Sequence, residues 1–307
     1  MPVSANTARS DDQSIDGLLS STKWTLTTIT YYYPQTFDMY APAASSSSAF
    51  QPNVATFKPF NSAMQTAVDK ALTFYSDVAN LTFVKKTNDS LNDQAILRYA
   101  FTSIDDPQWK GDTSNIGAAS SPGESTLSGD AWFPTTIYNY GDWGVPGSTM
   151  FQNILHETGH AMGLKHPQDG GSFGPSPSSH NSNEYSVMAY NDFLSGGVPF
   201  GGTYLQSLMM DDIAALQYLY GANYTHNAGD TTYQWSPTTG QMTATENNVA
   251  TISDKPVVNR IMMTVWDGGG VDTYDFSNYT TALKVDLQPG GWTTVGHIDP
   301  FPQRAEL

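Results

Sequence analysis

The chain has 307 residues, with 29 acidic and 13 basic side chains, a formal net charge of −16 and no cysteine. This charge disfavours nucleic acid as a partner because phosphates would be repelled, while acidic side chains can serve calcium, which prefers oxygen ligands. The lack of cysteine excludes disulfides, thiolate metal ligands and cysteine nucleophiles. Hydrophobic residues make up 39% of the chain, enough for a packed core, and no apolar run reaches the roughly 20 residues that cross a bilayer.

The N-terminal segment differs in character from the rest of the chain. Residues 1–14 show no core pattern, and they lack the basic start and apolar stretch of a conventional signal peptide. We therefore predict an N-terminal extension or a short propeptide over 1–14. A first strand is expected within 24–33, where β-branched and aromatic residues alternate in part, and an exposed, Ser-rich loop at 41–53.

A long helix is predicted to come after this loop. It would begin at Ser62, where Ser62 and Gln65 can form a capping box. Hydrophobic residues spaced three and four apart give it one buried face, which consists of Met64, Ala67, Val68, Ala71, Leu72, Tyr75 and Val78. Further strands are expected at 81–84 and 95–101. This order of a strand, a long helix and more strands predicts a layered domain of the α+β class.

The next stretch, 102–148, is rich in Gly, Ser, Pro and Asp, which predicts loops and short strands. A second helix is expected to begin near Thr149. There Thr149 and Gln152 can form another capping box.

A third helix is expected around 209–220, after a loop at 167–183, with Gly221 placed to end it. Beyond about residue 225, short polar strands and glycine turns replace the helical pattern. We therefore predict a domain boundary there.

The segment that carries most chemical information begins at His156. On a helix, His156 and His160 are one turn apart, so both imidazoles project from the same face. Gly163 can adopt the positive φ that ends the helix and turns the chain back, so that His166 supplies a third nitrogen. Three protein ligands leave one position open for water, which is typical of a catalytic zinc rather than a structural one. Glu157 lies beside the ligands and can reach such a water without binding the metal itself.

The alternative explanation is a surface helix that carries histidines by chance. The HExxH pattern alone is expected by chance in on the order of one in a hundred chains of this length. The added Gly163 and His166 make coincidence much rarer. The longer pattern therefore favours a zinc site.

Together with Met188 and Tyr190 in the segment Ser-Val-Met-Ala-Tyr, this motif resembles the metzincin metalloproteases. Pro167 directly follows the third histidine, and in this position it resembles the proline of the serralysin subfamily. The resemblance implies that Met188 forms the Met-turn, a hydrophobic floor under the histidines, and that Tyr190 approaches the metal and stabilises the oxyanion. Taken alone, the methionine would be an ordinary core residue and the tyrosine a packing residue.

Other segments extend the resemblance to about residues 15–295; they are 17–24, 76–83, 211–223 and 264–277. It implies a metzincin protease domain over 15–225, with a twisted mixed sheet, long helices and a zinc-binding active-site helix. It also implies the start of a calcium-binding β-roll or β-sandwich-like domain over 226–307. The nine-residue glycine and aspartate repeats of that family do not occur, and PFPQRAEL does not show its C-terminal export signal, so only a partial β-roll is expected.

Calcium is the second expected metal. Closely spaced glycines between Asp267 and Asp272 allow tight turns that aim carbonyl oxygens inward, while both carboxylates add charge. A solvated glycine and aspartate turn is the alternative. The resemblance implies a calcium ligand set of Asn227, Gly229, Thr231, Asp267, Gly269, Gly270 and Asp272.

The function expected from these features is that of a secreted zinc-dependent endopeptidase. Glu157 would take a proton from the zinc-activated water and pass it to the leaving amine, while Tyr190 and zinc stabilise the oxyanion. In related proteases the substrate lies extended beside an edge strand, and 118–134 is the expected source of that strand.

Protein or peptide substrates, and a protein inhibitor of the protease, are the expected partners of a monomeric chain, and the resemblance alone implies secretion. A catalytically silent, calcium-dependent binding protein is the first alternative, and a calcium-dependent structural or adhesion module is the second. The presence of Glu157 and Tyr190 argues against loss of activity, and the complete zinc motif argues against a purely structural module.

Overall fold

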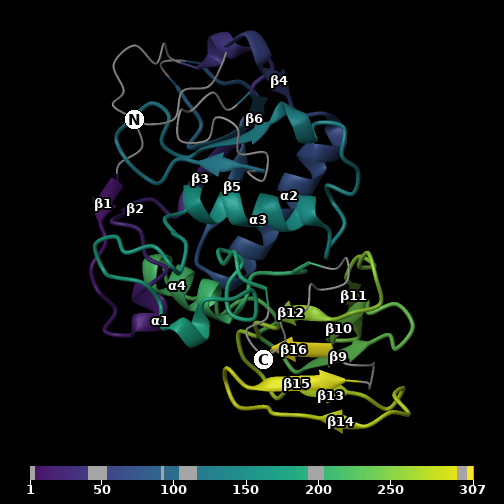
Figure 1. Cartoon of the computed structure of the whole chain (residues 1–307). Coiled ribbons are helices and arrows are strands. Elements are labelled where there is room, and N and C mark those ends of the chain that lie inside the picture. The colour runs from purple at the N-terminus through teal and green to yellow at the C-terminus, as the bar shows by residue number, and fades with distance from the viewer. Residues whose placement is uncertain are drawn as a thin grey trace.

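The computed structural model describes residues 4–40, 54–90, 93–103, 116–192, 204–295 and 303–306. The loop expected at 41–53 lies outside these ranges. Figure 1 shows a sheet with helices packed against it in the N-terminal part, and a second set of strands that comes after helix α4.

The N-terminal part is built on a six-stranded sheet, in the order β5-β3-β6-β8-β7 with β4 paired to β6 off this path. Its strands are β3 (Thr28–Tyr32), β4 (Lys58–Pro59), β5 (Thr82–Lys85), β6 (Leu97–Thr102), β7 (Ala118–Ala119) and β8 (Asp130–Pro134). Strands β5, β3, β6 and β8 run parallel, whereas β7 pairs antiparallel with β8. The sheet is therefore mixed, and β7 forms one edge of it.

Four α-helices lie in the described part of the chain: α1 (Gln13–Asp16), α2 (Ser62–Val78), α3 (Thr149–Ala161) and α4 (Met210–Tyr220). Helices α2 and α3 pack against each other and against the sheet (Figure 1). The seven residues expected on the inner face of α2 are all buried, which confirms the helical period read from the sequence. Gly221 ends α4 with a φ of 84°, as expected. None of the described helices has the length and apolar character needed to span a membrane.

Both expected capping boxes are wrong by one residue. Helix α2 is capped by Asn61, whose side-chain oxygen accepts from the Met64 N–H at 3.0 Å. Helix α3 is capped by Ser148, whose hydroxyl accepts from the Phe151 N–H at 3.1 Å. In each case an adjacent residue that caps equally well reaches the free N–H first. Gln152 instead accepts a hydrogen bond from the backbone of a distant loop.

The N-terminal segment takes part in the fold although its sequence shows no core pattern. Strand β1 (Ser4–Asn6) pairs antiparallel with β2 (Thr22–Trp24), and the short helix α1 lies between them in the chain. The strand expected within 24–33 is divided into the end of β2 and all of β3. Leu18 and Leu19, directly after α1, are buried in the main core.

The C-terminal part contains two four-stranded sheets (Figure 1). One has the order β11-β10-β9-β13 and the other β12-β16-β15-β14. The bounds of their strands are β9 (Thr231–Trp235), β10 (Met242–Glu246), β11 (Val249–Ile252), β12 (Met262–Thr264), β13 (Thr273–Asp275), β14 (Leu283–Lys284), β15 (Trp292–Val295) and β16 (Gln303–Glu306).

Short 3-10 helices lie in the N-terminal part: η1 (Phe37–Met39), η2 (Val54–Thr56), η3 (Thr135–Ile137) and η4 (Ser178–His180).

Candidate metal centre and active site

Helix α3 and the turn that ends it bring the histidines of the motif together. His156 and His160 lie one turn apart on α3, as the spacing predicts. The chain then reverses at Gly163, which has a φ of 101°. A Cβ at this position would lie 2.9 Å from the carbonyl oxygen of Thr22. Glycine is therefore required both by the positive φ and by the close approach of the N-terminal segment. The reversed chain carries His166 back toward the helix.

The three imidazoles converge through their Nε2 atoms. The Nε2 atom of His166 lies 3.2 Å from that of His156 and 3.0 Å from that of His160. Within the described residues, this trio is the single group of three or more His, Cys, Asp or Glu side chains whose ligand atoms lie within 4.8 Å of one another. Nitrogens that share one tetrahedral zinc at about 2.0–2.1 Å would lie about 3.3 Å apart, which is close to the observed spacing.

The other ring nitrogen of each histidine is already used. The Nδ1–H of His156 donates to the carbonyl oxygen of Val187 at 2.8 Å, and that of His160 donates to the carbonyl oxygen of Leu164 at 2.9 Å. His166 Nδ1 lies 3.0 Å from Oδ2 of an aspartate three residues on. These bonds place the ring proton on Nδ1, so each Nε2 keeps a lone pair. Burial and the neighbouring rings hold the pKa of His156 well below its usual value, and burial lowers the pKa of His166 to about 3.

Glu157 lies beside the histidines in a dry position. Its side chain is buried, with a relative exposure of 3%, and its Oε2 atom has no hydrogen-bond partner among the described residues. Burial raises the pKa of Glu157 to about 8. A cation held by the three Nε2 atoms would supply the missing counter-charge and favour the ionised carboxylate. The donor set and the unpartnered carboxylate oxygen both fit a zinc ion.

The chain that leads into β7 passes directly over this carboxylate. Asn153, one turn before Glu157 on α3, donates from Nδ2 to the carbonyl oxygen of Ile116 at 2.6 Å. A Cβ at Gly117 would lie 2.6 Å from Cδ of Glu157. The edge strand β7 therefore begins at the wall of the metal centre, within the range 118–134 from which a substrate-binding strand is expected.

Met188 and Tyr190 differ in their exposure. Met188 is fully buried against α3, and a Cβ at Gly159 would lie 2.5 Å from its Sδ atom. Tyr190 has a relative exposure of 68%, and its hydroxyl lies 2.7 Å from Nε2 of His166. The methionine thus packs beside the helix that carries His156 and His160, while the phenol stands at the exposed side of the three histidines.

Comparisons with known proteins show what the chain is similar to. Residues 50–221 match the family model described as Matrixin, and residues 222–300 match the one described as Peptidase M10 serralysin C terminal. Serralysin B of Dickeya chrysanthemi is 36% identical over 74% of this chain and 46% of its own length. Serralysin of Proteus mirabilis is 33% identical over 78% of this chain and 49% of its own length. Metallopeptidase AprA of Pseudomonas marginalis is 31% identical over 84% of this chain and 53% of its own length.

The chain belongs to the serralysin-type metzincins. It spans about half the length of the curated relatives that it matches. The matched family models meet between residues 221 and 222, directly after α4.

One residue that supports the centre of this serralysin-type chain was not expected from its sequence. The carboxylate of Asp212, fully buried on α4, accepts hydrogen bonds from the Ser186 hydroxyl at 2.6 Å and from the Val187 N–H at 2.8 Å. The carbonyl of Val187 in turn receives the His156 Nδ1–H. Asp212 therefore fixes the backbone that orients a zinc ligand. Two acidic residues in the first turn of α4 were the available signal, but they are also ordinary there because of the helix dipole.

The expected calcium turns of the serralysin-type chain lie next to each other. The N–H of Thr231 donates to Oδ1 of Asp272 at 2.9 Å, which joins the two segments. Asp267 accepts from the Gly269 N–H at 2.9 Å and from the Tyr233 hydroxyl at 2.6 Å. Two further expected ligands lie at the same junction: Asn227 has a φ of 47° and Gly270 a φ of 112°, so both turns are tight.

One acidic residue at these turns was not expected from the sequence. Oε1 of Glu246, on β10, accepts from the Gly229 N–H at 2.5 Å. Its carboxylate therefore lies beside a residue of the expected calcium ligand set.

Proposed function

We propose that this chain is a zinc-dependent endopeptidase that cleaves peptide bonds in proteins. The observation that carries the proposal is the convergence of three proton-free Nε2 atoms beside the buried carboxylate of Glu157, whose Oε2 atom has no hydrogen-bond partner among the described residues. His156, His160 and His166 would hold the metal. Bound zinc would act as a Lewis acid that makes a water molecule more acidic and polarises a peptide carbonyl.

Residues of the chain itself would carry out the proton transfers and stabilise the negative charge that develops on the substrate. Glu157 is placed to accept a proton from the attacking water and to give that proton to the leaving nitrogen. Because Glu157 is buried, bulk water has little access to its carboxylate. Tyr190, at the open side, can donate a hydrogen bond from its phenol to the oxygen that becomes negatively charged. Met188, fully buried beside Gly159 of α3, would support the rings as the hydrophobic floor of the site.

The edge strand β7 gives the substrate a place to lie. A peptide in extended conformation can add to the edge at Ala118 and Ala119, because among the described strands β7 pairs with β8 alone. Gly117 brings that edge against Glu157. The scissile bond of a peptide added to β7 would then lie near the carboxylate, which favours an endopeptidase that accepts extended segments of protein.

Membership of the serralysin type favours an extracellular place of action, and it favours calcium as a second metal at the turns near Asp267 and Asp272. A catalytically silent binding protein remains the competing function. The intact pair of Glu157 and Tyr190 argues against it, because a binding protein would need neither a proton acceptor nor an oxyanion donor.

Cleavage of casein tests the proposal. The parent chain is compared with Glu157→Ala at equal zinc content, and with Asp38→Ala as a control that removes an exposed carboxylate on η1. Parent and control are expected to cleave casein, while Glu157→Ala keeps zinc and loses nearly all turnover. A zinc-loaded parent that leaves casein intact would contradict the endopeptidase, and an active Glu157→Ala would remove Glu157 from the mechanism.

A further inference from the structure

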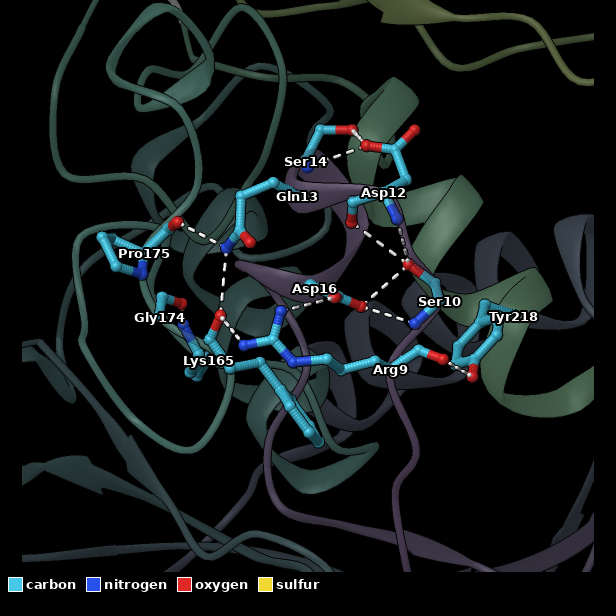
Figure 2. Close-up of polar contacts among 11 residues, drawn as sticks. Arg9, Ser10, Asp12, Gln13, Ser14, Asp16, Lys165, Gly174, Pro175 and Tyr218 are labelled. Atoms are coloured by element: carbon cyan, nitrogen blue, oxygen red, sulfur yellow. Dashed lines mark hydrogen bonds and ion pairs between the residues drawn. The ribbon is translucent and has the colours of Figure 1, made fainter.

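The third zinc ligand is held differently from the other two. His156 and His160 are fixed by the hydrogen bonds of a single helix. His166 lies in the loop 165–176, which we name the ligand loop; within it the structure contains no α-helix or β-strand. Contacts other than those of a helix or strand, within the loop and from outside it, must therefore fix this ligand. Figure 2 shows that the N-terminal segment provides many of them.

Two N-terminal side chains bind carbonyl oxygens of the ligand loop (Figure 2). The guanidinium of Arg9 donates to the carbonyl oxygen of Phe173 at 3.3 Å. The side-chain amide of Gln13 donates to the same oxygen at 3.1 Å and to the carbonyl oxygen of Pro175 at 2.8 Å. Arg9 also lies 5.8 Å from the centre of the Phe173 ring. These contacts hold the far end of the loop.

Lys165 fastens the near end of the loop, directly before His166. Its backbone N–H donates to the carbonyl oxygen of Leu18 at 2.8 Å. Its ammonium group donates to the carbonyl oxygens of Gly17, of Asp169 at 2.8 Å and of Gly174 at 3.0 Å. The Lys165 side chain thus connects the N-terminal segment to residues near the start and near the end of the ligand loop. Asp169 itself lies 3.0 Å from Nδ1 of His166, so the same contacts orient the ligand ring.

A buried carboxylate organises the N-terminal segment for this purpose. Asp16 has a relative exposure of 1%. It accepts from the Ser10 N–H at 2.6 Å and from the Ser10 hydroxyl at 2.8 Å, and it pairs with the Arg9 guanidinium at 3.7 Å. The hydroxyl of Tyr218 on α4 also donates to the carbonyl oxygen of Arg9 at 2.7 Å. Asp16 therefore aims Arg9 at the ligand loop (Figure 2).

We propose that residues 9–17, here called the N-terminal clamp, position His166 for zinc. The clamp fixes the ligand loop before the metal arrives, so binding does not have to order it. Its residues act through the loop, and none of them touches the metal or a substrate. The segment then belongs to the metal-binding fold and is not a dispensable propeptide. This inference rests on the zinc site proposed above.

Zinc affinity measures the role of the clamp without relying on catalysis. The Kd for zinc is determined by competition with a chromogenic chelator for the parent and for Arg9→Ala/Gln13→Ala. The double variant is expected to bind zinc about 10–100-fold more weakly, the loss typical when a group that orients a metal ligand is removed. Lys85→Ala, which breaks an exposed ion pair between β5 and Asp69 of α2, is the control and should bind like the parent.

Further variants make the result decisive. His166→Ala defines the affinity of the site without its third ligand, and the double variant should fall between this value and that of the parent. If the double variant fails to fold by circular dichroism, the single variant Gln13→Ala is used, with a smaller loss expected. Removal of residues 1–10 should also weaken zinc binding.

Two results would overturn the clamp: unchanged zinc affinity in folded clamp variants, or removal of residues 1–10 that raises activity at constant zinc affinity. The second result would identify a propeptide. A folded parent without zinc affinity would instead overturn the zinc site of the proposed function, so failure of that function is distinguished from failure of the clamp.

Discussion

The histidine centre and the glycine-rich turns near residue 270 use their donor atoms in opposite ways. At the centre, the Nε2 atom of His166 lies 3.2 and 3.0 Å from those of His156 and His160, and none of the three imidazoles carries a proton to share with another. In the turns, Asp267 and Asp272 already accept hydrogen bonds from Gly269, Tyr233 and Thr231. The first group turns its lone pairs toward one common point, whereas in the second some of the carboxylate oxygens already accept hydrogen bonds from the protein.

Because of this difference, the two metals are expected to act on the fold in different ways. Zinc is expected to enter a site whose ligands already point at it, so its removal should change activity more than structure. Calcium is expected to replace the hydrogen bonds of the turns, so its binding should change local structure and stability. Each half of this comparison can be tested by substitution, and the largest effect is expected at the histidine centre.

Gly117→Ala should lower turnover at the histidine centre without moving a metal ligand. The added Cβ would lie 2.6 Å from Cδ of Glu157 and must displace either the carboxylate or the chain leading into β7. Turnover is expected to fall by about 100-fold or more, because a shift of about 1 Å in a reacting group can cost that much. Casein cleavage measures turnover and chelator competition measures the zinc Kd. We expect the Kd to change by less than about threefold, since a ligand is not moved.

The matched control is Gly141→Ala, whose Cβ would have no neighbour within 4 Å. It should keep full turnover. Parent-like activity in Gly117→Ala would show that Glu157 has room to move without loss, and the close approach of β7 would then have no catalytic meaning.

Calcium should stabilise the parent through the turns. At a concentration 100 times its Kd, a ligand that binds the folded state alone contributes about 2.7 kcal/mol. Thermal unfolding with and without calcium, followed by circular dichroism, should show this gain. Asp272→Asn should need about tenfold or more calcium for the same gain, because ligand charge sets calcium affinity.

Asp286→Asn serves as the control for this measurement, because Asp286 accepts a backbone N–H in a different turn of the same region. It should keep the parent response. A midpoint that does not respond to calcium in any variant would make the glycine turns ordinary solvated turns, the alternative that the sequence also allowed.

Asp212 should make the free energy of unfolding of the chain depend on pH. Burial raises the pKa of Asp212 to about 7, although three hydrogen bonds to its carboxylate oppose this. The folded state therefore holds a proton on Asp212 between about pH 4 and 7, where the unfolded state has lost it. The contribution of this group is fully present below about pH 4 and is lost as the pH rises through 7, with a slope of about 1.4 kcal/mol per pH unit.

Asp212→Asn should remove this slope. Urea unfolding of the metal-free protein between pH 4.5 and 7.5, with a chelator present, measures the difference in unfolding free energy between parent and variant. That difference should shrink steadily as the pH rises. Asp93→Asn, which changes an exposed carboxylate, should show no such trend. A constant difference for Asp212→Asn would show that this carboxylate is ionised throughout.

Sequence patterns located the features that depend on spacing along one element. The buried face of α2 and the placement of His156 and His160 on α3 result from the helical period. The end of α4 at Gly221 results from the preference of glycine for positive φ. Helix caps were placed one residue late, because neighbouring polar residues cap equally well and only the final backbone decides between them.

Contacts between distant segments left no comparable signal. The N-terminal clamp binds the ligand loop through backbone carbonyl oxygens, which any residue provides, so the sequence of 1–14 looks unstructured. Asp212 acts through the N–H of Val187, a backbone group that every residue except proline has, so this contact leaves no signal in the sequence either. Residues that act on backbone atoms are invisible to a pattern of hydrophobic or catalytic side chains, and only the folded chain shows them.

The distance along the chain between Arg9 and Phe173 has a consequence for the time course of folding. The two residues are 164 positions apart, and such pairs close late because a long loop must first lose its freedom. Helix α3 can form earlier from local contacts. A newly made chain therefore reaches a stage at which two histidines are in place and the third is still unrestrained. If the chain has the proposed function, full metal affinity, and with it cleavage of other proteins, is then gained among the last events of folding.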